Sequence, residues 1–509
     1  MDELTLGIIA GWSDIFQNKL VVSPTTHVHS ATKYASQNTF AMSASRLRLG
    51  IGVGVGVGVG ASCLASWVAS SSRLAGLGPL SDDVGEGRRH FDARPSLLSC
   101  SNAPFGGGGG GLACDASQGS SQQHGTKKNK TRVLIVGAGL TGCLIGALLR
   151  REFKDVIHLA MYERASYPAG RFGAVARWQT AVADLGAQVL SIVNVDEEHE
   201  DAGKGGHGIT HDAILQAREE VSRLVRAGAL HEVVDDEDVL GETEERTLWA
   251  GLWQHYVARL GLADVMSSYL AEAKPDTLHF TTKVEAIERV NSTKYGANSY
   301  RVTSRVRRNG SVGTHTSTFD HVIFCVPAPD VLAIRGLVDL LPRWCVDALR
   351  RVEYDSRDTV AIFYDGSMRP HLSKLFGSRF ELALDFPTAV EVDNDIHTLI
   401  WQEAKQDRVR YACGGVTAHF RTRSSNVAAP DGPDLVERVH ATVARRCDLP
   451  IASVRSSAVA SKVVQWDTAQ VIRPMESVAD AATSCCETGN LVIAGDFFTV
   501  SLISNESWS

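Results

Sequence analysis

One segment, Arg132 to Phe153, limits the possible folds of this chain more than any other. It opens with an apolar run, Val133 to Val136, of the kind that forms a buried parallel strand. Gly137, Gly139 and Gly142 follow at the spacing G-x-G-x-x-G. At that spacing the first glycine permits a tight turn, the second lets the backbone approach a diphosphate, and the third lets a helix pack closely on the sheet. The segment therefore predicts a strand, a turn and a helix that together bind a dinucleotide.

The residues that follow complete a dinucleotide-binding unit. Val156 to Tyr162 predicts a second strand, and Glu163 at its end stands about 20 positions after Gly142, where a ribose-binding carboxylate belongs. The N-terminus of the predicted helix offers free N–H groups and a positive dipole end to phosphates. The carboxylate of Glu163 also disfavours NADP in this loop, because the 2′-phosphate would meet a negative charge.

The glycine motif alone does not separate an FAD protein from an NAD dehydrogenase, and later residues favour FAD. Gly170 and Arg171 stand where many flavoproteins carry a Gly-Gly-Arg turn, although Ala169 replaces the first glycine, and an arginine there can hold a phosphate. The segment ADLGAQ, Ala183 to Gln188, follows. LVIAGD, Leu491 to Asp496, predicts a buried strand whose final carboxylate would bind the ribityl chain. The other two matches to G-x-G-x-x-G, Gly106 to Gly111 and Gly203 to Gly208, follow no predicted strand, so we expect no separate NADPH domain.

The fold class that these patterns predict is α/β: an FAD-binding Rossmann-type domain of the GR2 kind with a second, mixed α+β substrate domain. Leu278 to Val290, Ser299 to Val306 and Phe319 to Pro329 look like the successive strands of the three-strand excursion common in FAD domains. The expected FAD part comprises residues 131–192, 277–330 and 488–509, and the expected substrate part comprises residues 209–276 and 331–487.

Composition narrows the class of partner. Hydrophobic residues make up 44% and charged residues 21% of the 509, which are ordinary globular values. The net charge of -7 argues against nucleic acid, because binding to phosphate backbones needs clustered Lys and Arg. The ten cysteines include no pair at the spacing of a zinc or redox site and only one adjacent pair, Cys485 and Cys486, so we expect structural thiols and no metal.

The first 130 residues differ from the rest. They are rich in Ser, Ala and Gly, including a Gly-Val repeat that ends at Gly60, and show no sustained periodicity. We interpret them as a largely disordered segment outside the fold. No charged residue lies between Arg48 and Arg73, so a targeting sequence that starts near Met42 stays open, and with it a cytoplasmic or an organellar location. The alternating glycines have poor helix propensity, and no stable membrane insertion is expected.

In this order the motifs resemble the renalase family, within the larger superfamily of flavin amine oxidases. The similarity covers most of Thr131 to Phe498. It is carried by VLIVGAGLTG (133–142), MYERA (161–165), ADLGAQ (183–188), VIFCVPAPDVL (322–332), RVEYDSRDTVAIFYDGS (351–367), VVQWDTAQV (463–471) and IAGDFF (493–498).

The resemblance implies a set of site residues. Those expected at the FAD are Gly137, Gly139, Thr141, Gly142, Glu163, Gly170, Arg171, Gln188, Val189 and Asp496. Two more, Trp466 and His419, are expected to line the substrate face of the flavin as catalytic residues. For Trp466 plain packing stays an alternative, and for His419 a hydrogen-bonded core histidine does.

The resemblance also implies an activity. Renalase-like proteins are flavin oxidases that take a hydride from dihydro-NAD(P) reduced at ring position 2 or 6, and O2 reoxidises the flavin to give H2O2. Proximity to the flavin can supply most of the acceleration, which fits a sequence without a convincing nucleophile and base. Two alternatives stay open: a flavin amine oxidase acting on mono- or polyamines, and a catalytically degenerate flavoprotein that serves as a scaffold.

Two further departures from the family bear on these alternatives. Val195 to Gly208 predicts an acidic, solvated inserted loop. After GDFF the family continues into a helix whose N-terminus points at the flavin. Here the given sequence ends at Ser509, and its last residues, ESWS, stand where that helix would begin. We therefore expect weak FAD binding or poor turnover, which is also the main support for the scaffold alternative. Against an amine oxidase, no Tyr occurs between Val471 and Ser509, where those enzymes usually place aromatic side chains around the flavin.

Overall fold

The computed structural model describes residues 130–168, 170–193, 211–233, 253–291, 298–308, 310–384, 396–406, 413–420, 432–475 and 490–496. All of them belong to one compact unit. The predictions for the first 129 residues, Ala169, the acidic loop, the adjacent cysteines and the residues after Asp496 lie outside this range. Within it, no helix is long and apolar enough to cross a membrane.

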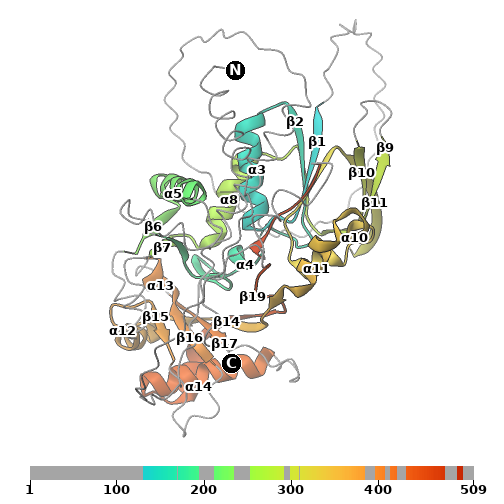
Figure 1. Ribbon diagram of the computed structural model, residues 1–509. Helices are drawn as coiled ribbons and strands as arrows, with labels where there is room; N and C mark the ends of the chain where they lie inside the picture. The colour runs from blue at the N-terminus through green and yellow to red at the C-terminus, as the bar shows by residue number, and fades with distance from the viewer. Residues whose placement is uncertain are drawn as a thin grey trace, which may run out of the picture. The chain divides into compact units, whose positions relative to one another are not determined.

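A five-stranded parallel sheet carries the glycine motif (Figure 1). Its order is β20-β12-β1-β2-β8. Its strands are β1 (Thr131–Val136), β2 (Ile157–Tyr162), β8 (Thr277–His279), β12 (His321–Phe324) and β20 (Leu491–Ile493). The apolar runs explain the pairing, because a parallel strand is covered on both faces and needs continuous apolar residues. The strands predicted from Val156 and from Leu491 are therefore present, with β20 beside β12.

Helix α3 (Leu140–Phe153) begins directly after the glycines and packs against α8 (Leu262–Ala273). Its apolar side chains Leu144, Ile145 and Leu149 are buried. The two helices cross closely at Gly146, where an added Cβ would lie 3.1 Å from the Cβ of Ala273. This contact holds α3, and with it the glycine loop, in a fixed position on the sheet.

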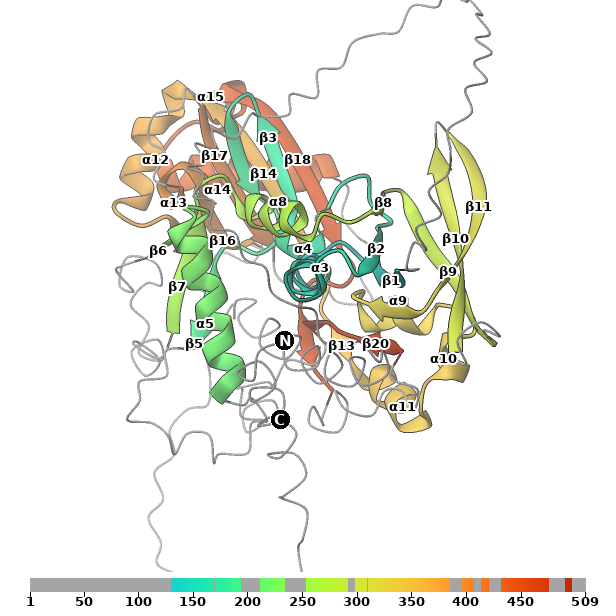
Figure 2. The ribbon, with the colours of Figure 1, turned by 90° about the horizontal axis from the view of Figure 1, so that it is seen from above.

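The predicted three-strand excursion exists, but one of its strands was assigned wrongly. The sheet is antiparallel, in the order β11-β10-β9, and lies to one side of the parallel sheet in Figure 2. Its strands are β9 (Thr282–Asn291), β10 (Asn298–Arg308) and β11 (Ser311–Phe319). The segment from Phe319 to Pro329 instead supplies β12 of the parallel sheet. The strand β11 lacks an apolar pattern because six of its nine residues are exposed.

A second five-stranded sheet, antiparallel in the order β15-β16-β17-β14-β18, carries the other half of the site. Its strands are β14 (Arg357–Asp365), β15 (Glu381–Ala383), β16 (Ile396–Trp401), β17 (Cys413–Phe420) and β18 (Ala458–Trp466). Alternate residues of β14 face opposite sides, as in any strand. Val360 and Ile362 join the core under the covering helices, whereas Ala361 and Phe363 pack against the hairpin of β3 (Val175–Trp178) and β4 (Ala181–Asp184).

The remaining elements connect or cover these sheets. The helices over the second sheet are α12 (Arg369–Phe376), α14 (Gly432–Cys447) and α15 (Ile451–Ser457). A small sheet consists of β5 (Leu190–Val193), β6 (Leu230–Glu232) and β7 (Trp253–Ala258), with α5 (His211–Arg226) beside it. The short elements are α4 (Gly170–Gly173), α9 (Ala328–Leu332), α10 (Leu337–Leu340), α11 (Arg343–Arg351), β13 (Glu353–Tyr354), η2 (Gly366–Met368), α13 (Gln402–Lys405) and β19 (Val471–Arg473). The division into an FAD part and a substrate part stays a prediction.

Candidate active site

The three motif glycines meet different surroundings. Gly137 has φ +100°, and a Cβ there would lie 2.5 Å from the carbonyl oxygen of Cys325. At Gly142 a Cβ would lie 2.0 Å from the carbonyl oxygen of Gly137. At Gly139, by contrast, no described atom lies within 4 Å of the added Cβ. The first and third glycines therefore allow the chain to pack on itself, and the second opens onto free space.

The N-terminus of α3 borders this free space. Gly139 is its N-cap and has no side chain that could accept from the first-turn N–H groups. Thr141 lies in that turn and is partly exposed. Unpaired amides and the positive dipole end of a 14-residue helix favour a phosphate at this place.

Glu163 lies at the end of β2 and contacts the glycine loop. It is buried to 8% exposure, and its Oε2 accepts from the N–H of Ala138 at 2.7 Å. Its Oε1 accepts from the N–H of Ala165 at 2.8 Å. Each carboxylate oxygen can accept more than one hydrogen bond, so the group can also bind the hydroxyls of a sugar.

Arg171 and Asp496 form an ion pair between α4 and the residues that follow β20. Their Nη1 and Oδ2 lie 2.6 Å apart. Burial lowers the pKa of Arg171, but the charge and hydrogen bond of Asp496 outweigh burial and raise it, so the guanidinium stays charged. Nη1 also donates to the carbonyl oxygen of Thr468 at 3.3 Å.

Tyr354 completes this group and was missed at the sequence level. Its hydroxyl donates to Asp496 Oδ1 at 3.5 Å and accepts from the N–H of Ala328 at 3.2 Å. The guanidinium of Arg171 lies over its ring, 5.4 Å from the centroid. Tyr354 stands inside a segment that resembles the family, but no local pattern distinguishes it from a packing residue.

Close backbone contacts join these groups into one continuous row. A Cβ on Gly170 would lie 3.3 Å from the Cα of Gly139, so α4 begins against the glycine loop. A Cβ on Gly186 would lie 1.6 Å from the carbonyl oxygen of Arg171, which accepts from the N–H of Ala187 at 3.1 Å. We call the line of residues Glu163, Gly139, Arg171, Gln188 and His419 the site row.

Gln188 and His419 form the far end of the site row. The Gln188 Nε2 lies 3.0 Å from the Nε2 of His419, and the His419 Nδ1 lies 3.2 Å from the hydroxyl of Thr359. The residue is partly exposed. Burial of the imidazole, followed by the charges of Arg357, Lys405 and His397, lowers the pKa of His419 to about 3. The imidazole is therefore neutral at physiological pH.

A buried ion pair supports this end of the row. Lys405 and Asp184 both have 0% side-chain exposure, and their Nζ and Oδ2 lie 2.6 Å apart. Lys405 also donates to the Oε1 of Gln188 at 2.9 Å. The sequence analysis singled out the ADLGAQ segment that contains Asp184, but no signal indicated its pairing with Lys405, because 221 positions separate them.

Trp466 and Val189 make packing contacts. The indole N–H of Trp466 donates to the carbonyl oxygen of Leu185 at 3.2 Å, and its ring packs on the small cluster around Ala361 and Phe363. Val189 packs against the buried cluster of Val257, Phe380 and Ile400. Both residues thus lie beside the ADLGAQ segment, and their contact with a cofactor stays a prediction.

Comparison with known proteins identifies the family. Residues 135–202 match the model of the NAD(P)-binding Rossmann-like domain. Residues 174–465, more than half of the chain, match the model of the flavin containing amine oxidoreductase. The chain belongs to the flavin-containing amine oxidoreductase family. A flavin is the cofactor of this family, and its members are oxidoreductases.

Individual proteins that resemble this chain were also found. Renalase of Mus musculus is 26% identical over 245 residues, which are 47% of this chain and 60% of that protein. The match thus spans three fifths of the length of that relative. A crystal structure from Exiguobacterium sp. 255-15, a proposed protoporphyrinogen oxidase, aligns over 72% of this chain and 94% of that chain, with a TM-score of 0.45 and 12% identity.

The site row has the groups that a flavin dinucleotide needs. It offers one carboxylate for a sugar, one glycine loop at a helix N-terminus for a diphosphate, and one arginine for phosphate oxygens. The space beside Gly139 is what a bulkier side chain would fill. In this family member the described residues therefore fit a bound dinucleotide.

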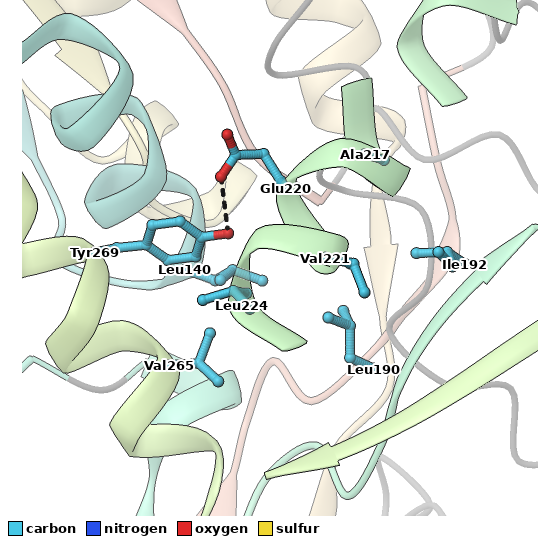
Figure 3. A pocket seen from close by; sticks show the side chains of 9 residues that line it. All are labelled: Leu140, Leu190, Ile192, Ala217, Glu220, Val221, Leu224, Val265 and Tyr269. Atoms are coloured by element: carbon cyan, nitrogen blue, oxygen red, sulfur yellow. Dashed lines mark hydrogen bonds between the residues drawn. The ribbon is translucent and has the colours of Figure 1, made fainter. Parts of the chain in front are cut away.

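A small apolar cavity lies apart from the site row, between α3, α5 and α8 (Figure 3). Its volume is about 20 Å³, enough for one water molecule. The hydroxyl of Tyr269 hydrogen-bonds Glu220 at its edge, and no residue of the site row lines it. The described residues contain no group of three His, Cys, Asp or Glu that could bind a metal.

Proposed function

We propose that this chain binds FAD along the site row and oxidises dihydro-NAD(P) that carries its extra hydrogen at ring position 2 or 6. The products are NAD(P) and, after reaction with O2, H2O2. Bound FAD supplies the acceptor for the hydride and the later reaction with oxygen. The protein supplies the position of the two rings and a site from which water is excluded.

Each group of the site row has a proposed role. Glu163 binds ribose hydroxyls, and the loop of Gly137, Gly139, Thr141 and Gly142 lies under the diphosphate. The other proposed cofactor contacts are Gly170, Arg171, Gln188, Val189 and Asp496. Arg171 holds a phosphate, and Asp496 orients the guanidinium and accepts from the ribityl chain.

The observation that supports this choice of substrate is the 26% identity to renalase of Mus musculus over 245 residues, and the neutral imidazole of His419 at the end of the row is compatible with it. A dihydronicotinamide becomes a cation when it loses a hydride, and a second positive charge beside it would oppose this step. A neutral His419 avoids that repulsion. Trp466 is proposed to line the same face.

A second candidate, the oxidation of mono- or polyamines, is favoured by the match of residues 174–465 to the amine oxidoreductase model. A neutral His419 also suits this reaction, because an amine must lose its proton before it is oxidised. The two candidates therefore share the fold and the neutral His419, and they differ in the substrate that reduces the flavin.

The test is anaerobic reduction of the FAD-loaded chain, followed as the loss of flavin absorbance near 450 nm, on the order of one equivalent of substrate per flavin. The 2- and 6-dihydro isomers should bleach the flavin rapidly, and the ordinary 4-dihydro isomer and amines should not. Admission of O2 should then restore the colour and release H2O2. Bleaching by benzylamine or spermine but not by the isomers would contradict the proposal and support the second candidate.

A further inference from the structure

Lys405 has no role in the proposed reaction, yet it is one of the most buried charged groups in the described part of the chain. It pairs with Asp184 at 2.6 Å, and both side chains have 0% exposure. The other oxygen of Asp184 accepts from the N–H of Leu262 at 2.9 Å. A buried ion pair contributes little net stability, because desolvation offsets the attraction between the charges. The contact of Lys405 with Gln188 indicates that this lysine affects the site row.

Lys405, together with Gln402 and two backbone carbonyl oxygens, fixes the orientation of the Gln188 amide. An ammonium group only donates hydrogen bonds, so the atom 2.9 Å from Nζ must be the amide oxygen, Oε1. The side-chain amide nitrogen of Gln402 donates to the same oxygen at 3.0 Å. The amide nitrogen of Gln188 therefore points the other way, to the carbonyl oxygens of Asp184 and Gly186 and to His419.

The fixed amide in turn determines the tautomer of His419. The Gln188 Nε2 shares its two protons among three neighbours and cannot accept, so a proton on the His419 Nε2, 3.0 Å away, would face another donor, and that ring nitrogen carries none. The proton must lie on Nδ1, from which it is donated to the hydroxyl of Thr359 at 3.2 Å. The charged or titratable groups around the ring are Arg357 from β14, His397 from β16 and Lys405 from α13.

We propose that Lys405 is a positioning residue that, through the Gln188 amide, holds His419 as the neutral tautomer with its proton on Nδ1. The neutral tautomer keeps a positive charge away from the nicotinamide as that ring becomes a cation. This consequence for hydride transfer rests on the proposed function. The tautomer itself is a property of the protein and exists without flavin or substrate.

The test is NMR of the full chain labelled with ¹³C-histidine, with the His419 signal assigned as the one lost in His419→Gln. In the parent protein we expect only the neutral Nδ1–H form between pH 8 and pH 5. The double variant Asp184→Asn/Lys405→Gln removes both charges and keeps hydrogen-bonding side chains, so no unpaired buried charge remains. In it we expect the Nε2–H form to appear and the pKa of His419 to rise, because the positive charge of Lys405 is one of the causes that lower it. The control Lys462→Gln removes a lysine that hydrogen-bonds the carbonyl oxygen of Val175 and should change neither property.

An unchanged tautomer and titration in the folded double variant would overturn the proposal, as would an Nε2–H form in the parent. If the double variant does not fold, Gln188→Glu tests the same step, because a carboxylate keeps a partner for Lys405 but cannot donate to His419. In that variant His419 must take a proton on Nε2, and a neutral Nδ1–H form would overturn the proposal.

The activity of the FAD-loaded double variant separates this proposal from the proposed function. Its rate of flavin bleaching should fall as the pH drops below its new His419 pKa, whereas the parent should show no such fall. If the parent itself is not bleached by dihydronicotinamides, the proposed function fails, and the NMR result still decides the role of Lys405.

Discussion

At Gly139 the structure leaves free the space that a Cβ would fill, whereas at Gly142 the same atom would lie 2.0 Å from the carbonyl oxygen of Gly137. One motif thus contains glycines with different physical requirements. Gly142 serves the packing of α3 on the sheet, and Gly139 leaves room for a ligand. Substitutions at the two positions should therefore affect different properties.

We expect Gly139→Ala to fold normally and to bind FAD at least about tenfold more weakly, or ~1.4 kcal/mol. Its backbone, φ -78° and ψ -174°, suits alanine, so the methyl group affects only the ligand. Gly142→Ala should instead lower the stability of the apoprotein by about 1–3 kcal/mol, because the backbone must move. Thermal melting of the apoprotein and FAD titration measure the two effects. Undiminished FAD affinity in Gly139→Ala would place the diphosphate elsewhere.

Glu403 makes stability depend on pH. It is buried and accepts from the N–H of Gly415, and burial raises its pKa to about 7. A carboxyl group whose pKa is raised on folding binds more protons in the folded state, so stability falls as the pH rises from about 4.5 through 7. The loss is at most about 3 kcal/mol.

Glu403→Gln should remove this loss, so the drop in unfolding free energy between pH 5 and pH 8 becomes smaller. Denaturant melts at the two pH values measure it. Glu288→Gln, at an exposed residue paired with Arg301, is the control and should leave the pH dependence unchanged. An equal drop in Glu403→Gln and the parent would show that Glu403 is ionised in the folded state at pH 5.

Among the elements, the first strand, helix and second strand could be predicted because their signals are local. Val133 to Val136 is buried on both faces, and the glycines mark the turn. The strand β11 could not be predicted, because its residues are mostly exposed and its position in the sheet is set by pairing with β10. The helix α13 has only four residues, too few for a periodic pattern.

The crossing of α3 and α8 gives a prediction about elements. Gly146→Val would place two methyl groups where a Cβ already lies 3.1 Å from Ala273. The helices should separate, with a loss of about 1–3 kcal/mol in stability and weaker retention of flavin. Gly313→Val on β11, where no described atom lies within 4 Å of the added Cβ, is the control and should melt like the parent. Equal melting of Gly146→Val would contradict the close crossing.

Across the whole molecule, the candidate site could be predicted only in part. Sequence motifs predicted Glu163, Arg171 and Asp496 as site residues. In the structure the Nη1 of Arg171 lies 2.6 Å from the Oδ2 of Asp496. The structure also places Gln188 beside His419, a contact that the sequence did not predict. Lys405 was missed because its role comes from tertiary contacts with Asp184 and Gln188, and a lone lysine in sequence is usually solvated.

The site row is proposed to bind one flavin dinucleotide, and a titration of the purified full chain with FAD tests this binding. After removal of free flavin, the bound cofactor is released by denaturation, identified by mass and counted against protein. We expect saturable binding of about one FAD per chain, with affinity reduced in Gly139→Ala. Protein that stays colourless at saturating FAD, or that binds FMN equally well, would contradict the account.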